Sequence, residues 1–170
     1  MKVKLPHLAL SALLCFSVST SHAIEPTGLV EADLQQVYDR ITSIAALRDV
    51  CGERFSDLSP DVGRIHSAWL VDNRKFFSEL ETLWLRSFTF NESEMPSRVV
   101  RQRELRAALA ITLTSAIREN LFTRPLGTLR TACEGFANVA DGDYGNLTAV
   151  FETMLIEVRK SVEERSALRR

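Results

Sequence analysis

Apolar residues recur every three or four positions along most of this chain, and this spacing constrains the fold more than any other feature. The most regular example ends the chain, at Leu147, Val150, Phe151, Met154, Leu155, Val158 and Val162. This period puts side chains on one face of an α-helix, whereas a half-buried strand needs strict alternation, which the sequence lacks. Seven Gly and five Pro in 170 residues are also few for a turn-rich β fold. We therefore predict an all-α, single-domain bundle of about five helices.

The pattern divides into five helical segments. They cover residues 27–52, 59 to about 91, 97–122, a short stretch beginning at Pro125, and the chain after the loop at 141–146. Ser59 precedes Pro60 and is predicted to cap the second helix. The apolar arc of that helix is wide, so we expect it to be the central helix. The charged tail from about residue 163 to 170 is expected to fray.

Residues 1–23 have the three parts of a secretory signal peptide. Lys2 and Lys4 precede an apolar run at 8–18, and Ser21 and Ala23 provide small residues for cleavage. That run is shorter than the roughly 20 residues that span a bilayer. We expect cleavage near Ala23, a mature domain at 24–170 with no membrane span, and a periplasmic or secreted location. An uncleaved N-terminal anchor is the alternative.

Export determines how the cysteines are interpreted. Cys15 would leave with the signal peptide, so Cys51 and Cys133 remain as an even pair in an oxidising compartment. Both lie on apolar helix faces, which favours their meeting where two helices pack. We predict a Cys51–Cys133 disulfide, and the alternative is two buried free thiols.

The composition argues against several chemistries. The formal net charge is −1, which does not favour nucleic acid as a partner. The predicted mature chain has one histidine, His66, and no Gly-x-Ser-x-Gly motif, so we assign no catalytic residue and expect no metal or cofactor. The loop at 141–146 resembles a calcium loop only weakly, since Gly145 and Asn146 occupy the wrong positions.

Two groups of residues are candidate binding sites. One is an arginine cluster at the start of the third helix that would dock an anion or an acidic partner, unless Glu92, Glu94 and Glu104 neutralise it. The cluster consists of Arg98, Arg101, Arg103 and Arg106. The other is an apolar pocket, although aromatic residues at helical spacing more often form the core. It would comprise His66, Trp69, Phe77 and Trp84. We expect Trp69 in the core, with His66 beside it in a structural role.

These observations leave three functional hypotheses open. The leading one is a non-enzymatic exported protein that binds another envelope protein, such as an inhibitor or immunity-type factor of a cell-envelope enzyme. The second is a small-molecule-binding protein with the aromatic pocket. The third is an envelope enzyme that uses carboxylates such as Glu79 or Glu104 turned inward with a raised pKa. The residue pattern does not set the oligomeric state.

Overall fold

The computed structural model describes residues 24–87 and 95–167, apart from the side chains of Met95, Pro96, Arg98 and Gln102. The described chain is all-α and contains seven helices and no strand. They are α1 (Val30–Arg54), α2 (Ser59–Asp72), α3 (Arg74–Ser87), α4 (Met95–Phe122), α5 (Leu126–Glu134), α6 (Phe136–Ala140) and α7 (Leu147–Ala167). The predicted signal peptide lies outside the described residues. Within them, no helix is both long and apolar enough to cross a membrane.

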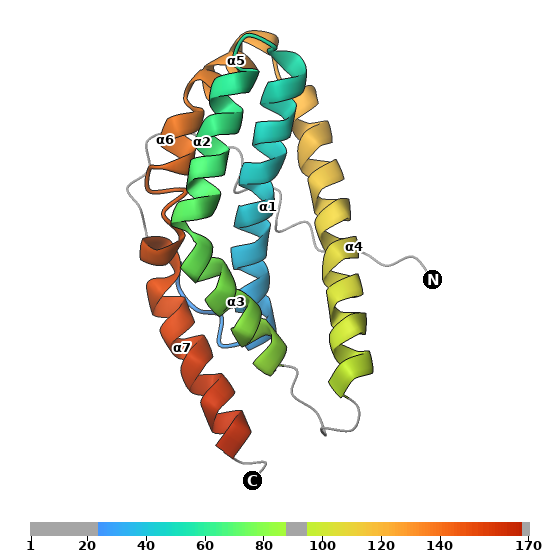
Figure 1. Ribbon diagram of the computed structural model, residues 1–170, viewed down its shortest axis with the longest axis vertical. Helices are drawn as coiled ribbons and strands as arrows, with labels where there is room; N and C mark the ends of the chain where they lie inside the picture. The colour runs from blue at the N-terminus through green and yellow to red at the C-terminus, as the bar shows by residue number, and fades with distance from the viewer. Residues whose placement is uncertain (1–23, 88–94, 168–170) are drawn as a thin grey trace.

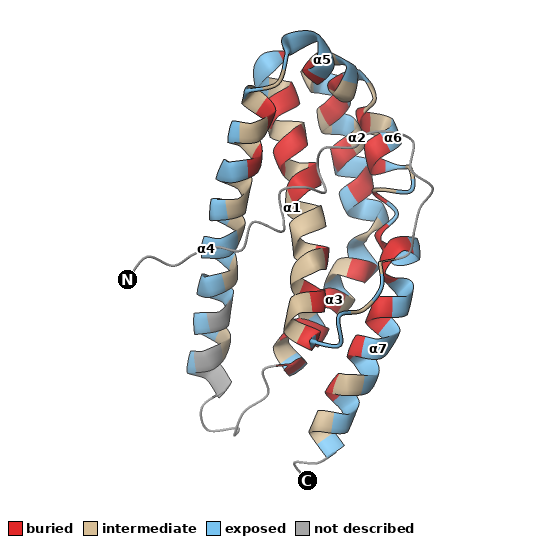
Figure 2. Cartoon of the chain, turned by 180° about the vertical axis from the view of Figure 1, so that it is seen from behind, coloured by how far each residue is buried: buried red, intermediate tan, exposed pale blue. Residues whose placement is uncertain are grey.

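Helix α1 is the centre of the bundle and packs against all six other helices. Figure 1 shows α4 on one side of it, with α2, α3, α6 and α7 on the other and α5 across one end. Buried residues occur along the whole length of α1, from Val30 to Cys51 (Figure 2). The prediction that the second segment would be central is therefore wrong, because its wide apolar arc belongs to two helices.

The second segment breaks at Asn73. Its backbone N–H and its side-chain Nδ2 both donate to the carbonyl oxygen of Trp69, at 3.0 Å each. A side chain that competes for a backbone carbonyl in this way ends a helix. The chain then restarts as α3, so each half presents its apolar residues to a different neighbour. Gly135 makes a similar break between α5 and α6.

Helix ends deviate from the sequence predictions by a few residues. Helix α2 begins at Ser59 itself with no side-chain cap, so the predicted serine cap is wrong, while Pro60 does lie in the first turn. Helix α1 continues past Gly52 to Arg54. Helix α7 extends to Ala167, beyond the point where we expected the charged tail to begin, and Arg165 forms an ion pair with Glu31 at 3.0 Å.

The disulfide is present as predicted. Cys51 of α1 and Cys133 of α5 are bonded, with Cα atoms 5.5 Å apart, and both residues are buried. The bond fastens the end of α1 to the short α5–α6 unit. The core continues from there through the large buried side chains Leu34, Ile44, Phe136, Phe151 and Met154.

Candidate functional site in the groove between α1 and α4

A groove of about 240 Å³ separates α1 from α4. Helix α4 packs chiefly on α1, and the small side chains of Ala107 and Ala110 leave space between the two helices. Polar side chains line the groove from both sides. It is formed by Gln35, Tyr38 and Thr42 of α1 and by Arg103, Arg106, Ala107, Ala110 and Leu113 of α4.

Tyr38 holds Arg106 in place inside this groove. Arg106 Nη1 donates to the Tyr38 hydroxyl at 2.6 Å, and the guanidinium lies 4.8 Å from the centre of the Tyr38 ring. Trp84 supports that ring edge-on from behind, with centroids 5.3 Å apart. Burial raises the pKa of Tyr38 above its ordinary value, against the opposing effect of Arg106. Tyr38 is therefore a neutral phenol that orients the cation without neutralising it.

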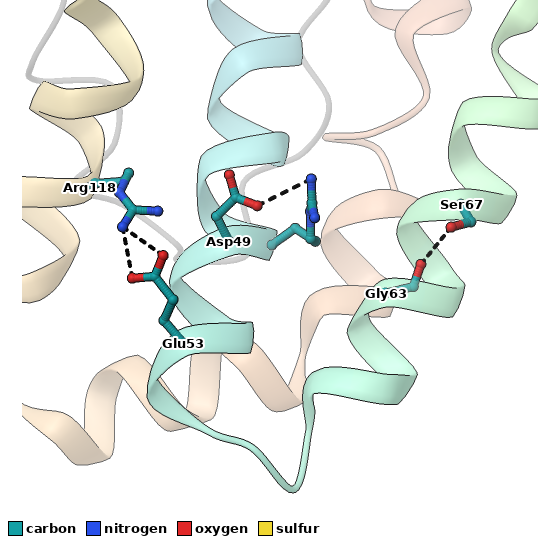
Figure 3. Close-up of polar contacts among 6 residues, drawn as sticks. Asp49, Glu53, Gly63, Ser67 and Arg118 are labelled. Atoms are coloured by element: carbon teal, nitrogen blue, oxygen red, sulfur yellow. Dashed lines mark hydrogen bonds and ion pairs between the residues drawn. The ribbon is translucent and has the colours of Figure 1, made fainter. Parts of the chain in front are cut away.

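The arginines of α4 differ in their partners. Arg103 pairs with Glu81 of α3 at 3.2 Å. Arg118 Nη2 donates to both carboxylate oxygens of Glu53 at 2.7 Å, which ties α4 to α1 (Figure 3). Arg106 forms no ion pair with any residue that the structure describes. A half-buried cation without a carboxylate partner retains the capacity to bind an anion.

The predicted arginine cluster is not one surface. Arg103 and Arg106 line the groove, whereas Arg101 is exposed on the outer side of α4. Arg98 belongs to the same helix, but its side chain is outside the described residues. Of the acids expected to neutralise the cluster, Glu104 is exposed, and residues 92 and 94 lie outside the described range. The acid that pairs with the cluster is Glu81, from a different helix.

The four residues of the predicted aromatic pocket lie in two separate clusters. Trp69 is 2% exposed, stands edge-on to Phe77 at 5.5 Å and lies 5.7 Å from His66 between ring centres. Trp84 belongs to the separate Tyr38 cluster. Trp69, Trp84 and His66 are buried and Phe77 packs against the core, and the placement of Trp69 and His66 agrees with the prediction. Burial, aided by Arg48, lowers the pKa of His66 below its ordinary value, against the opposing effect of Asp49.

The carboxylates expected to turn inward do not do so. Glu79 pairs with Arg159 near the surface, and Glu104 is exposed. The inward acids are on α1 instead. Asp33 is buried and accepts hydrogen bonds from the Thr27 backbone N–H at 2.8 Å and from its hydroxyl at 2.6 Å. Asp39 is half-buried, and burial raises its pKa although Gln35 donates to it at 2.6 Å.

The sequence reasoning missed the α1 side of the groove. Gln35, Tyr38 and Thr42 are three or four residues apart, so they share one face of the helix. A polar stripe of this kind on a helix with many buried residues could have indicated that this face lines a groove.

A second groove, of about 440 Å³, lies between α3 and α7. Its walls mix both signs of charge, with Lys75 and Arg159 close to Glu79 and Glu163. Glu79 and Arg159 pair with each other, and the cations that line this groove are exposed, whereas Arg106 in the α1–α4 groove is half-buried.

The loop at 141–146 is built to join helices. The carbonyl oxygen of Tyr144 accepts from Arg40 Nη1 at 3.1 Å, and that of Gly145 accepts from Trp69 Nε1 at 2.9 Å. Two carbonyls of this loop therefore face protein donors, one of them a cation. Among the described residues, no three His, Cys, Asp or Glu side chains gather to hold a metal ion. Comparison with family models, curated proteins and solved structures finds no match for this chain.

Proposed function

We propose that this protein is an exported, non-enzymatic helical protein that binds an acidic segment of another cell-envelope protein, as an inhibitor or immunity-type factor of an envelope enzyme does. One observation carries the proposal: Arg106 is half-buried in the α1–α4 groove, is held by Tyr38 and has no carboxylate partner among the described residues. A carboxylate from a partner would complete its coordination.

The size and lining of the groove favour a protein segment over a free small molecule. At about 240 Å³ it is smaller than the roughly 300–1,000 Å³ of ordinary ligand pockets. It has room for one acidic side chain, with the aliphatic part on Ala107 and Ala110 and the carboxylate on Arg106. Arg103 is exposed, and among the described residues its ion pair is the surface pair with Glu81, so a partner can recruit it at small cost.

Two features support action outside the cytoplasm. The first 23 residues have the pattern of a secretory signal peptide. The Cys51–Cys133 disulfide is typical of proteins that fold in an oxidising compartment.

The carboxylate-enzyme alternative has Asp39 in its favour, since burial raises its pKa. However, Asp39 bonds to Gln35 and does not line the groove. A general acid must reach the atom that it protonates, and Asp39 is held behind Gln35. Binding is therefore the function that the geometry supports better.

The experiment is affinity capture from envelope extract with three proteins. The wild type and Arg106→Gln differ at the groove, and Arg74→Gln is the matched control because Arg74 is exposed on α3. Bound proteins are identified by mass spectrometry, and the folding of each variant is checked by far-UV circular dichroism. We expect one acidic partner that wild type and Arg74→Gln capture and Arg106→Gln loses.

Binding to that partner, measured with purified proteins, should weaken as salt is added, because the contact is between opposite charges. Equal capture by wild type and Arg106→Gln would contradict the role of the groove. Affinity independent of salt would contradict an acidic partner.

A further inference from the structure

The outer side of helix α4, turned away from α1, is exposed, and its large apolar residues flank a central line of small and polar residues. Of the nine large hydrophobic residues that are exposed in the described chain, four lie on this helix: Val100, Leu105, Leu109 and Ile111, at 54, 53, 43 and 68%. Between them lie Ala108, Thr112 and Ala116, also exposed. Figure 2 shows exposed residues along much of the outer side of α4, at the edge of the molecule. Such a concentration of apolar surface is typical of an interface.

The charged residues toward the two ends of this face are self-complementary. Arg101 and Glu119 are both exposed, and they are about five full turns apart at roughly 3.6 residues per turn, so they point in the same direction. Ala108 and Thr112 lie halfway between them on the same line. A second copy of α4, placed antiparallel about that midpoint, brings Arg101 of each chain opposite Glu119 of the other.

The apolar residues follow the same symmetry. Around a twofold axis between Ala108 and Thr112, Leu109 lies beside its own copy and Leu105 lies beside Ala116 of the other chain. Small residues at the crossing let the two helix backbones approach to the roughly 8–10 Å of packed helices. A twofold interface requires one patch that complements itself, and this face meets that requirement.

The helix dipole supports the antiparallel direction. Helix α4 has no acid in its first turn and no base in its last turn, where such charges would stabilise the dipole. An antiparallel copy brings Glu119 toward the beginning of its neighbour and Arg101 toward its end. A parallel pair would instead place like charges together at both ends.

We propose that the protein forms a twofold homodimer through the outer face of α4, with the two helices antiparallel and Arg101 of each chain paired with Glu119 of the other. The proposal is independent of the α1–α4 groove, which uses the inner face of the same helix. One helix pair is a small interface, so the dimer should be weak and should dissociate on dilution.

The test measures mass in solution across a concentration series. The full chain is expressed and purified as the cell leaves it, its intact mass is recorded, and its oligomeric state is followed by sedimentation velocity and light scattering. We expect a monomer–dimer equilibrium that Leu109→Asp abolishes while circular dichroism remains unchanged.

Charge exchange tests the register directly. Arg101→Glu alone and Glu119→Arg alone should each weaken the dimer about tenfold, because two symmetry-related pairs turn from attraction to repulsion. The double variant should recover wild-type affinity. Mixing the two single variants should give a heterodimer tighter than either homodimer. Lys160→Glu, an exposed charge on α7, is the control and should leave dimerisation unchanged.

Three outcomes would overturn the proposal. A monomer at every concentration up to about 100 µM would show that the face binds no second copy at useful strength. A dimer that survives Leu109→Asp would place the interface elsewhere. Weakening by both single exchanges, with no recovery in the double variant or the mixture, would exclude the antiparallel register.

Discussion

Gly145 is the position where one methyl group should do the most damage. It lies at the end of the loop after α6, its N–H donates to the Gly142 carbonyl at 3.0 Å, and its own carbonyl accepts from buried Trp69. A Cβ atom built on Gly145 would be 1.9 Å from the carbonyl oxygen of Ala140 and 2.5 Å from that of Val139. Both neighbours are backbone atoms, so the loop itself must move by about an ångström to accept Gly145→Ala.

The size of the effect follows from two contributions. Forcing a group into a packed site costs about 1–3 kcal/mol. Moving the loop also separates the Gly145 carbonyl from Trp69 Nε1, and leaving that buried donor unpaired costs about 1–3 kcal/mol. Gly145→Ala should thus lower the free energy of unfolding by about 2–6 kcal/mol. At about 2–4 °C per kcal/mol for a domain of this size, Tm should fall by roughly 4–24 °C.

The assay is thermal and urea unfolding, followed by far-UV circular dichroism and by tryptophan fluorescence, since Trp69 reports on the loop. Gly63→Ala is the matched control, because a Cβ there meets nothing within 4 Å in the interior of α2. That substitution should raise stability by about 0.5–1 kcal/mol through helix propensity. If Gly145→Ala unfolds within about 1 kcal/mol of wild type, then the loop yields freely and the packing argument is wrong.

Four further predictions test other parts of the molecule. Cys133→Ser should lower the free energy of unfolding by about 2–5 kcal/mol, measured by urea titration, and reducing the wild type should have a similar effect. Asp39→Asn should stabilise the protein at neutral pH. Folding raises the pKa of Asp39, so the wild type loses stability as the pH rises from the pKa of Asp39 in the unfolded chain to its pKa in the folded protein. The variant has no carboxyl group at this position and should lack that loss. Folding lowers the pKa of His66, so as the pH falls this histidine is protonated in the unfolded chain before it is protonated in the folded protein. The free energy of unfolding should therefore fall below about pH 6.5, and it should fall less steeply in His66→Gln. N-terminal sequencing of the exported protein should begin at Ile24, and a start at Lys2 would refute cleavage.

The sequence predicted the all-α class, the disulfide and the buried position of Trp69, because each depends on periodicity or compartment. It did not predict the break at Asn73. The apolar spacing continues across that residue, and a single asparagine does not show whether its side chain will face solvent or bond to the carbonyl of Trp69. The choice depends on tertiary contacts, since α2 and α3 each gain a separate neighbour when the helix bends.

The sequence also did not predict that α1 is the central helix. Helix α1 carries many polar residues, yet it packs against all six other helices. The polar residues are accommodated by specific partners: Tyr38 bonds to Arg106, Asp33 to Thr27, and Arg40 to the Tyr144 carbonyl. Those partners are distant in sequence or lie in loops, so no local pattern shows them.

The arginine cluster divides between two faces of α4, as its helical spacing requires. Arg101 and Arg103 are two residues apart, which on a helix turns their side chains about 200° from each other. Helix α4 therefore sends Arg103 and Arg106 toward α1 and Arg101 away from it. A charged cluster in sequence becomes two sites of different character: an inner cation held by a phenol, and an outer cation toward the end of the exposed face. Each site has its own experiment, and substitution of Arg106 should leave dimerisation intact while substitution of Arg101 leaves the groove intact. A loss of both properties from either single substitution would mean that α4 acts as one surface after all.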